Sequence, residues 1–204
     1  MTTWTKRTYK QNQEDLKNAS PHLIDDGGKV RDIEQDDTTE ALTTITYPHH
    51  EIHGGSSYTC QDTTANLGGE TGDHLQLLFT TADVAKRAHL FYHAYGAGAC
   101  YITLREAPTG GGAGGSAATI LNRRRDSAKT SSAIASVTKG ATASTGGTLL
   151  IEHYVGAGTK DGGEVRGTNE WVLAPNTTYA LRIYDTSAIA AWIDLSWYEH
   201  ADKS

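Results

Sequence analysis

Cysteine is scarce in this chain, with only Cys60 and Cys100 among 204 residues. Two cysteines are too few for the disulfide framework that holds many small secreted domains together. Folding in a reducing cytoplasm with both thiols free is the simplest interpretation. The sequence leaves open a single bridge between them.

Long apolar runs and an excess of positive charge are also missing. No run approaches the ~18 apolar residues that a membrane-spanning helix needs. The first thirteen residues, MTTWTKRTYKQNQ, include basic side chains but no apolar stretch, so we do not expect a secretory signal. The formal net charge of −6 argues against a general nucleic-acid binder, which would carry a basic patch.

The composition that is present favours β-structure. Hydrophobic residues make up only 37% of the chain, and glycine occurs 22 times. This balance is typical of strands with one solvated face, joined by many turns. We expect one β-domain over residues 43–204, long enough to bury roughly two-thirds of its unfolded surface.

Residues 1–42 are polar and predict an extended N-terminal arm. Two readings stay open: a free tail, or an arm that becomes ordered on a partner surface. In the second reading, scattered apolar side chains serve as the anchors. They are Trp4, Tyr9, Leu16, Leu23 and Ile24.

Alternating apolar and polar residues predict most of the strands. In DHLQLLF (73–79), for example, Leu75, Leu77 and Phe79 fall on one face, and residues 86–95 and 100–106 are predicted to form a hairpin. A short run at 43–47 ends at Pro48, and the glycine-rich segment 108–116 predicts a flexible loop. The further expected strands lie in 132–140 and 148–156, in 164–185 as two strands around the turn at Pro175-Asn176, and in 188–200.

About eight strands separated by turn signals, without a convincing helix, predict an all-β fold. The class is an antiparallel β-sandwich, jelly-roll-like, behind the N-terminal arm. The strand order does not follow from the sequence.

Clusters that might carry chemistry are few. His49, His50 and His53 are closely spaced, but they lack a companion cysteine or carboxylate at a recognised spacing, so we predict no metal site and no cofactor. No nucleophile elbow accompanies Ser56 and Ser57, so we predict no enzymatic activity.

Two features point instead to contacts with a partner. The Arg123–Arg125 run is the densest basic cluster, and we expect it to pair with acidic groups of an adjacent subunit, with plain solvation as the alternative. In the last strand Trp197 falls on the apolar face. Trp192 falls on the other face, where it is a candidate for a subunit contact or a ligand surface.

A series of short motifs occurs in order along the chain. HHEIHGGSSY (49–58) comes first, then Gly72-Asp73, then EAPT (106–109), in which Ala107-Pro108 departs from the usual pattern. Asn122, Arg123, Arg125 and Ser127 match an Asn-Arg-x-Arg-x-Ser element, followed by EWVLAPNTTY (170–179) and a terminal Trp197–His200. This ordered series resembles that of a family of tailed-phage virion proteins. The resemblance runs over residues 43–203 and does not include the arm.

The resemblance implies membership of a bacteriophage virion, made in the host bacterial cytoplasm, and no catalytic residues. The expected function is a capsid decoration (cement) protein, a homotrimer that binds the major capsid protein or neighbouring virion proteins. The first alternative is a collar, tail or fibre component that binds host-surface glycan. A depolymerase is the second, and it requires two carboxylates in a cleft.

Overall fold

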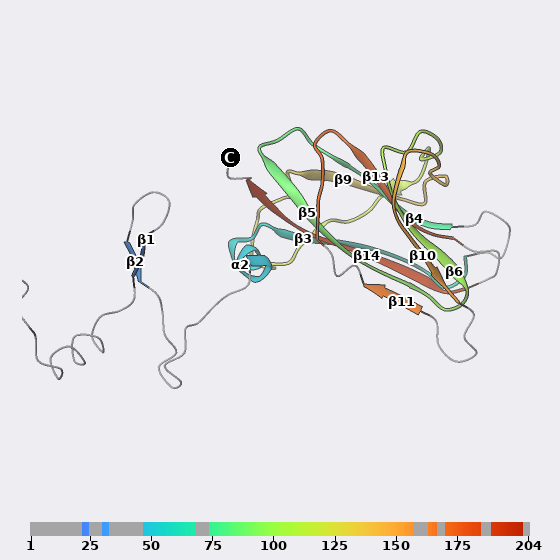
Figure 1. The fold of residues 1–204 in the computed structure, drawn as a ribbon, viewed down its shortest axis with the longest axis horizontal. Helices are drawn as coiled ribbons and strands as arrows, with labels where there is room; N and C mark the ends of the chain where they lie inside the picture. Colours follow the sequence, from blue (N-terminus) through green and yellow to red (C-terminus); the bar gives the residue numbers. More distant parts are fainter. Residues whose placement is uncertain are drawn as a thin grey trace, which may run out of the picture. The chain divides into compact units, whose positions relative to one another are not determined.

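The structure, a computed structural model, describes residues 22–24, 30–32, 47–67, 74–156, 163–166, 170–184 and 189–201. The chain divides into two units, residues 1–46 and residues 47–204. In the first unit, strand β1 (His22–Ile24) pairs antiparallel with β2 (Val30–Asp32). The second unit, here called the body, is a β-sandwich whose described residues include one short helix (Figure 1).

The first sheet of the body, the β5 sheet, has the order β11-β5-β14-β3-β8, with β12 also paired to β5. Every pair in it is antiparallel. Its strands are β3 (Ser57–Thr64), β5 (Lys86–Gly96), β8 (Leu121–Asn122), β11 (Gly163–Arg166), β12 (Trp171–Val172) and β14 (Ala191–Ala201).

The second sheet, the β6 sheet, has the order β10-β6-β13-β4-β9-β7, again antiparallel throughout. Its strands are β4 (His74–Thr81), β6 (Cys100–Glu106), β7 (Ser116–Ala117), β9 (Ile134–Lys139), β10 (Thr148–Val155) and β13 (Thr178–Tyr184).

The core lies between the two sheets, and the alternation in the sequence explains it. Leu75, Leu77 and Phe79 of β4 are buried, as predicted. On β14, Ile193, Leu195 and Trp197 face the same interior. Each large apolar side chain removed from water contributes about 1.5–3 kcal/mol, so the two sheets together supply an ample core. The prediction of an all-β antiparallel sandwich is confirmed.

The predicted hairpin of residues 86–95 and 100–106 is wrong. β5 pairs with β14, β11 and β12, whereas β6 pairs with β10 and β13. The bend at 97–99 therefore carries the chain from one sheet to the other. A turn signal between two alternating segments does not distinguish such a corner from a hairpin, because both need the same local reversal.

The expectation of no helix is also wrong. Helix α2 (Tyr47–Gly54) begins where a strand was expected to end, with Pro48 in its first turn. Proline suits that position, because the first amides of a helix have no intrahelical acceptor. Helix α2 contacts β3 and β14.

The glycine-rich segment 108–116 is held in place rather than free. The backbones of Gly110 and Thr145 each donate a hydrogen bond to the other. The Gly112 amide donates to the Thr142 carbonyl, and the Thr142 amide donates to the Ala113 carbonyl. Gly111 has φ +75°, and an added Cβ there would lie 1.8 Å from the Ala143 carbonyl oxygen. Glycine is required at this position because the backbones approach so closely.

Cys60 and Cys100 are both buried and form no disulfide bond, in agreement with the simplest interpretation of the sequence. Among the described residues, no helix is long and apolar enough to cross a membrane.

Candidate assembly interface

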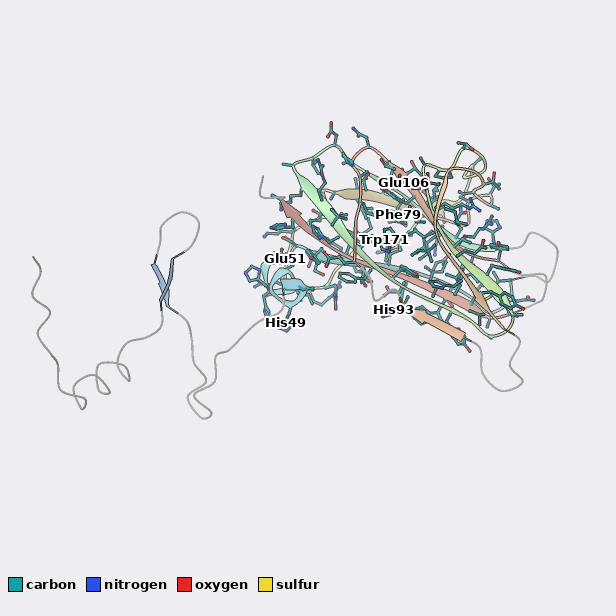
Figure 2. The ribbon with its side chains drawn as sticks, in the orientation of Figure 1. His49, Glu51, Phe79, His93, Glu106 and Trp171 are labelled. Carbon is teal, nitrogen blue, oxygen red and sulfur yellow. The ribbon has the colours of Figure 1, made fainter. Side chains whose placement is uncertain are left out.

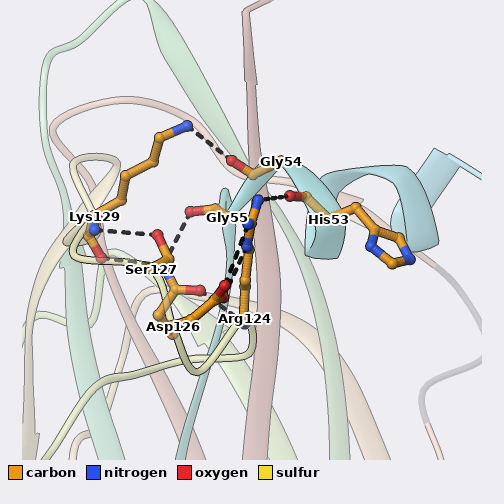
Figure 3. A network of polar contacts seen from close by, with 8 residues as sticks. His53, Gly54, Gly55, Arg124, Asp126, Ser127 and Lys129 are labelled. Carbon is orange, nitrogen blue, oxygen red and sulfur yellow. Dashed lines mark hydrogen bonds and ion pairs between the residues drawn. The ribbon is translucent and has the colours of Figure 1, made fainter.

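The end of helix α2 is held by the loop that follows β8. The Arg124 guanidinium donates to the His53 carbonyl at 2.6 Å, and the Lys129 ammonium donates to the Gly54 carbonyl at 2.8 Å. The side-chain amide of Asn122 donates to the Gly55 carbonyl at 2.9 Å. These carbonyls belong to the helix end, where no further intrahelical donor exists. Figure 3 shows this network, which we call the α2 clamp.

The Arg124 side chain is further fixed by Asp126, whose carboxylate lies 2.9 Å from its Nε. The hydrogen bond and the charge of Asp126 raise the pKa of Arg124, and the same contacts lower the pKa of Asp126. Both side chains are exposed, so the pair orients the guanidinium more than it stabilises the fold.

A buried carboxylate holds the start of β9. Glu199 is 3% exposed, and its oxygens accept hydrogen bonds from the Ser131 and Ser132 hydroxyls at 2.6 and 2.7 Å. The backbone amides of Ser132 and Ala133 donate to it at 2.8 and 2.9 Å. Multiple donors compensate the desolvation of the carboxylate. Burial, followed by the charge of Glu199, raises the pKa of nearby Tyr58 to about 12.

A second polar cluster joins two other motifs. The Tyr179 hydroxyl donates to the Glu106 carboxylate at 3.0 Å and accepts the Ala174 amide at 3.0 Å. Burial, with a smaller contribution from Glu106, raises the pKa of Tyr179 to about 12, although the hydrogen bond from the Ala174 amide acts in the opposite direction. A tyrosine bonded back to the chain a few residues upstream is a recurrent corner device in β-sandwiches. Many residues of the ordered motifs therefore form hydrogen bonds within the body and stabilise its fold.

This result changes the interpretation of the predicted basic site. Arg123, Arg124 and Arg125 are all exposed, but Arg124 bonds the α2 backbone of its own chain. Arg125 donates to the Asn122 carbonyl at 3.3 Å. The predicted pairing of this run with another subunit stays a prediction, and Arg123 and Arg125 are its better candidates.

The clustered histidines lie on α2. His49 and His53 have their Nε2 atoms 2.9 Å apart, while His50 Nδ1 lies 3.4 Å from the Glu51 carboxylate. Among the described residues, no group of three or more His, Cys, Asp or Glu side chains is arranged to hold a metal ion.

A histidine and a carboxylate meet at the margin of the β5 sheet. His89 Nδ1 contacts the Glu170 carboxylate, and the Tyr198 hydroxyl donates to the same oxygen at 2.6 Å. The His89 and Tyr198 rings stack with centroids 4.6 Å apart. Burial alone would raise the pKa of Glu170, but the bonds from Tyr198 and His89, with the charge of His89, lower it. The cluster ties Glu170, just before β12, to β5 and β14.

Trp192 lies on the outer face of the β5 sheet, as predicted, and Trp197 lies in the core. Trp192 is half-buried and pairs with Tyr95 in register, and its indole meets the His93 ring edge-on at 6.4 Å. Figure 2 labels His93 on this sheet. Asp194, two residues on, accepts the Thr59 hydroxyl at 2.6 Å.

Three tyrosines form a row across neighbouring strands of the β6 sheet. Tyr154 of β10, Tyr101 of β6 and Tyr184 of β13 share one register position. Their ring centroids are 4.9 and 5.2 Å apart, and the Arg182 guanidinium lies 4.3 Å from the Tyr184 centroid. Tyr154 is 61% exposed and Tyr101 39%. We call this row the tyrosine patch.

The patch reaches the edge of the sheet. Among the described strands, β10 pairs with β6 alone. Leu149 and Tyr154 on it are exposed. Exposed tyrosines next to an open strand edge are typical of surfaces that bind another protein. The patch cannot be recognised from the sequence, because three distant segments meet there. The sequence feature that points to the patch is that each tyrosine lies on the outward face of its strand, directly beside a residue that is buried.

The predicted anchors of the arm are placed only in part. Leu23 and Ile24 lie in strand β1. Trp4, Tyr9 and Leu16 lie outside the described residues.

Comparison of the chain with known protein families, curated proteins and solved structures finds no match.

Proposed function

We propose that this protein is a virion structural protein of a tailed bacteriophage, most specifically a capsid decoration protein that binds the major capsid protein shell. The observation that carries the proposal is the tyrosine patch beside the open edge of β10. Aromatic side chains that are stacked on each other lose little conformational entropy on binding, and they supply much of the binding energy at protein interfaces.

The strand order supports the jelly-roll form of the sandwich, a fold used in viral capsids and also in lectins. If β7, β8, β9 and β12 are left out, the remaining strands of the body pair in nested order along the sequence. The first strand, β3, pairs with the last, β14, and β4 pairs with β13. β5 pairs with β11, and β6 pairs with β10. Such nested pairs arise when one long antiparallel hairpin is folded over so that its strand pairs alternate between two sheets.

The ordered motifs support the same proposal. Their polar residues bond the chain's own backbone in the α2 clamp, around Glu199 and around Tyr179. A decoration protein needs a rigid body more than a reactive centre, since it works by many simultaneous contacts that resist internal pressure.

The direct test is cosedimentation of the full chain with purified phage shells that lack it. We expect saturable binding, and at least tenfold weaker binding for the double variant Tyr101→Ser/Tyr154→Ser. Leu121→Ser is the matched control, because Leu121 has the same 39% exposure as Tyr101 but lies on the β5 sheet. Equal binding by the wild type and the double variant would refute the use of this patch.

Trimer formation and the function of the arm are separate parts of the proposal. Light scattering during size-exclusion chromatography measures the mass in solution, with a homotrimer expected. Deletion of residues 1–40 tests the arm as an anchor: the truncated chain should bind shells more weakly. Unchanged affinity would show that the body alone supplies the contact.

The outer face of the β5 sheet favours a second candidate, binding of host-surface glycan. Trp192 and Tyr95 lie side by side there, one register step from Asp194 and Gln61. Aromatic faces with adjacent polar groups suit sugar rings. A glycan array with the wild type and Trp192→Ala separates the candidates, because only this function predicts glycan binding that the substitution removes.

A further inference from the structure

Two histidines on helix α2 point their ring nitrogens at each other. The Nε2 atoms of His49 and His53 are 2.9 Å apart, the ring centroids are 4.7 Å apart, and the rings are tilted by 57°. Both residues are exposed. A spacing of four residues puts them on one face of the helix, as in helical zinc sites.

The backbone under this pair is fixed by the α2 clamp. The His53 carbonyl accepts from Arg124, and the next two carbonyls accept from Lys129 and Asn122. Figure 3 shows the His53 imidazole pointing away from the clamping loop. The helix turn is therefore already ordered, and a ligand at the two rings would not have to fold it.

We propose that His49 and His53 chelate a divalent late first-row transition metal, with Cu(II) preferred and Ni(II) next. A metal–nitrogen distance of about 2.0–2.1 Å and a right angle at the metal require nitrogens about 2.9 Å apart. A tetrahedral ion would need them about 3.3–3.4 Å apart. The observed 2.9 Å matches two neighbouring positions of a square-planar ion.

The neighbouring side chains determine whether the ion has further protein ligands. Glu51 lies between the two histidines in sequence, but it is 9% exposed and is bonded to His50. No third His, Cys, Asp or Glu joins the pair among the described residues. Water completes the coordination, so the site is an open, two-histidine chelate on the surface.

Protons compete with the metal for the same nitrogens. Without metal, the two Nε2 atoms share a hydrogen bond, which places a proton on one of them. The metal replaces this bond, so that each imidazole binds through a deprotonated Nε2 and keeps its proton on Nδ1. Metal affinity should therefore fall as the pH is lowered.

The test is a calorimetric and visible-absorption titration of the full chain with CuCl₂ and NiCl₂ at pH 7.5 in a non-chelating buffer. We expect one tight Cu(II) site per chain, with two nitrogen ligands in the electron paramagnetic resonance spectrum. His49→Ala and His53→Ala should each weaken that site at least tenfold. His50→Ala and His153→Ala, which remove exposed histidines outside the pair, should retain it.

Circular dichroism of each variant checks that the body is folded, which is expected because alanine favours a helix. The proposal is overturned if folded His49→Ala binds Cu(II) as tightly as the wild type. It is also overturned if the spectrum at one equivalent shows no imidazole ligands. Shell binding does not enter the test, so its outcome is independent of the proposed function.

Discussion

The Ser131 hydroxyl donates to the Glu199 carboxylate at 2.6 Å across 68 residues of sequence. This bond joins the last strand of the body to the loop before β9. Because Glu199 is 3% exposed, its donors substitute for water that it loses on folding. The loop and the strand are therefore stabilised together.

Replacement of Glu199 by glutamine should lower the free energy of unfolding by about 2–3 kcal/mol. The N–H groups of the new amide would face hydrogen-bond donors of residues 131–133, and some of these donors would lose their acceptor. Urea denaturation measures the loss. Glu152→Gln, on exposed β10, is the control and should stay within ~0.5 kcal/mol of the wild type. Equal stability of both variants would contradict this role of Glu199.

The Tyr179 hydroxyl makes two bonds, and Tyr179→Phe should cost about 1–3 kcal/mol by removing both. The Ala174 amide and the Glu106 carboxylate would each lose a partner. Thermal and urea unfolding of this variant should be compared with Tyr154→Phe, whose side chain is 61% exposed in the wild type. A Tyr179→Phe protein as stable as Tyr154→Phe would show that the corner bonds contribute nothing.

The lowered pKa of Glu170 predicts a dependence of stability on acid. A carboxyl whose pKa is lower in the folded chain stabilises the fold above its ordinary value of 4.5, and this contribution disappears as the pH falls through the folded pKa. The stability difference between wild type and Glu170→Gln should be largest near pH 6–7 and should shrink below about pH 4.5. Urea midpoints from pH 7 to pH 3 measure it. Parallel curves would disprove the linkage.

Both thiols should be inert in the folded protein. Burial, with the charges of Asp194 and Asp62, raises the pKa of Cys60 to about 11 against a smaller opposing effect of Lys139, and Cys100 is fully buried. Only the thiolate reacts readily. An aromatic disulfide reagent should therefore detect no thiol in the native chain and two in denaturant. Rapid native labelling would mean that the sandwich opens.

Strand positions were predictable because burial on one face forces alternation along each segment. The 148–156 and 132–140 predictions correspond to β10 and β9 for this reason. Strand partners were not predictable, since pairing depends on which segments meet after the chain crosses between sheets. The failed hairpin of β5 and β6 is the example.

Helix α2 and the tyrosine patch were missed for a related reason. The helix has eight residues, three of them histidine, and its end is stabilised by Asn122, Arg124 and Lys129 from far along the chain. Helices so short are not stable by themselves. The patch likewise exists only after β6, β10 and β13 have come into register. Trp192 was placed correctly because its position depended on the periodicity of a single strand.

The unpaired edge of strand β10 affects how readily the protein pairs with other extended chains. An open edge with Leu149 and Tyr154 exposed can template pairing with any extended chain, which is the first step toward aggregates. The register of β10 shifts between Leu149 and Ile151, and Glu152 follows directly. A bulge and a charge are the usual protections of such an edge. These two features disfavour pairing of β10 with the edge strand of another copy.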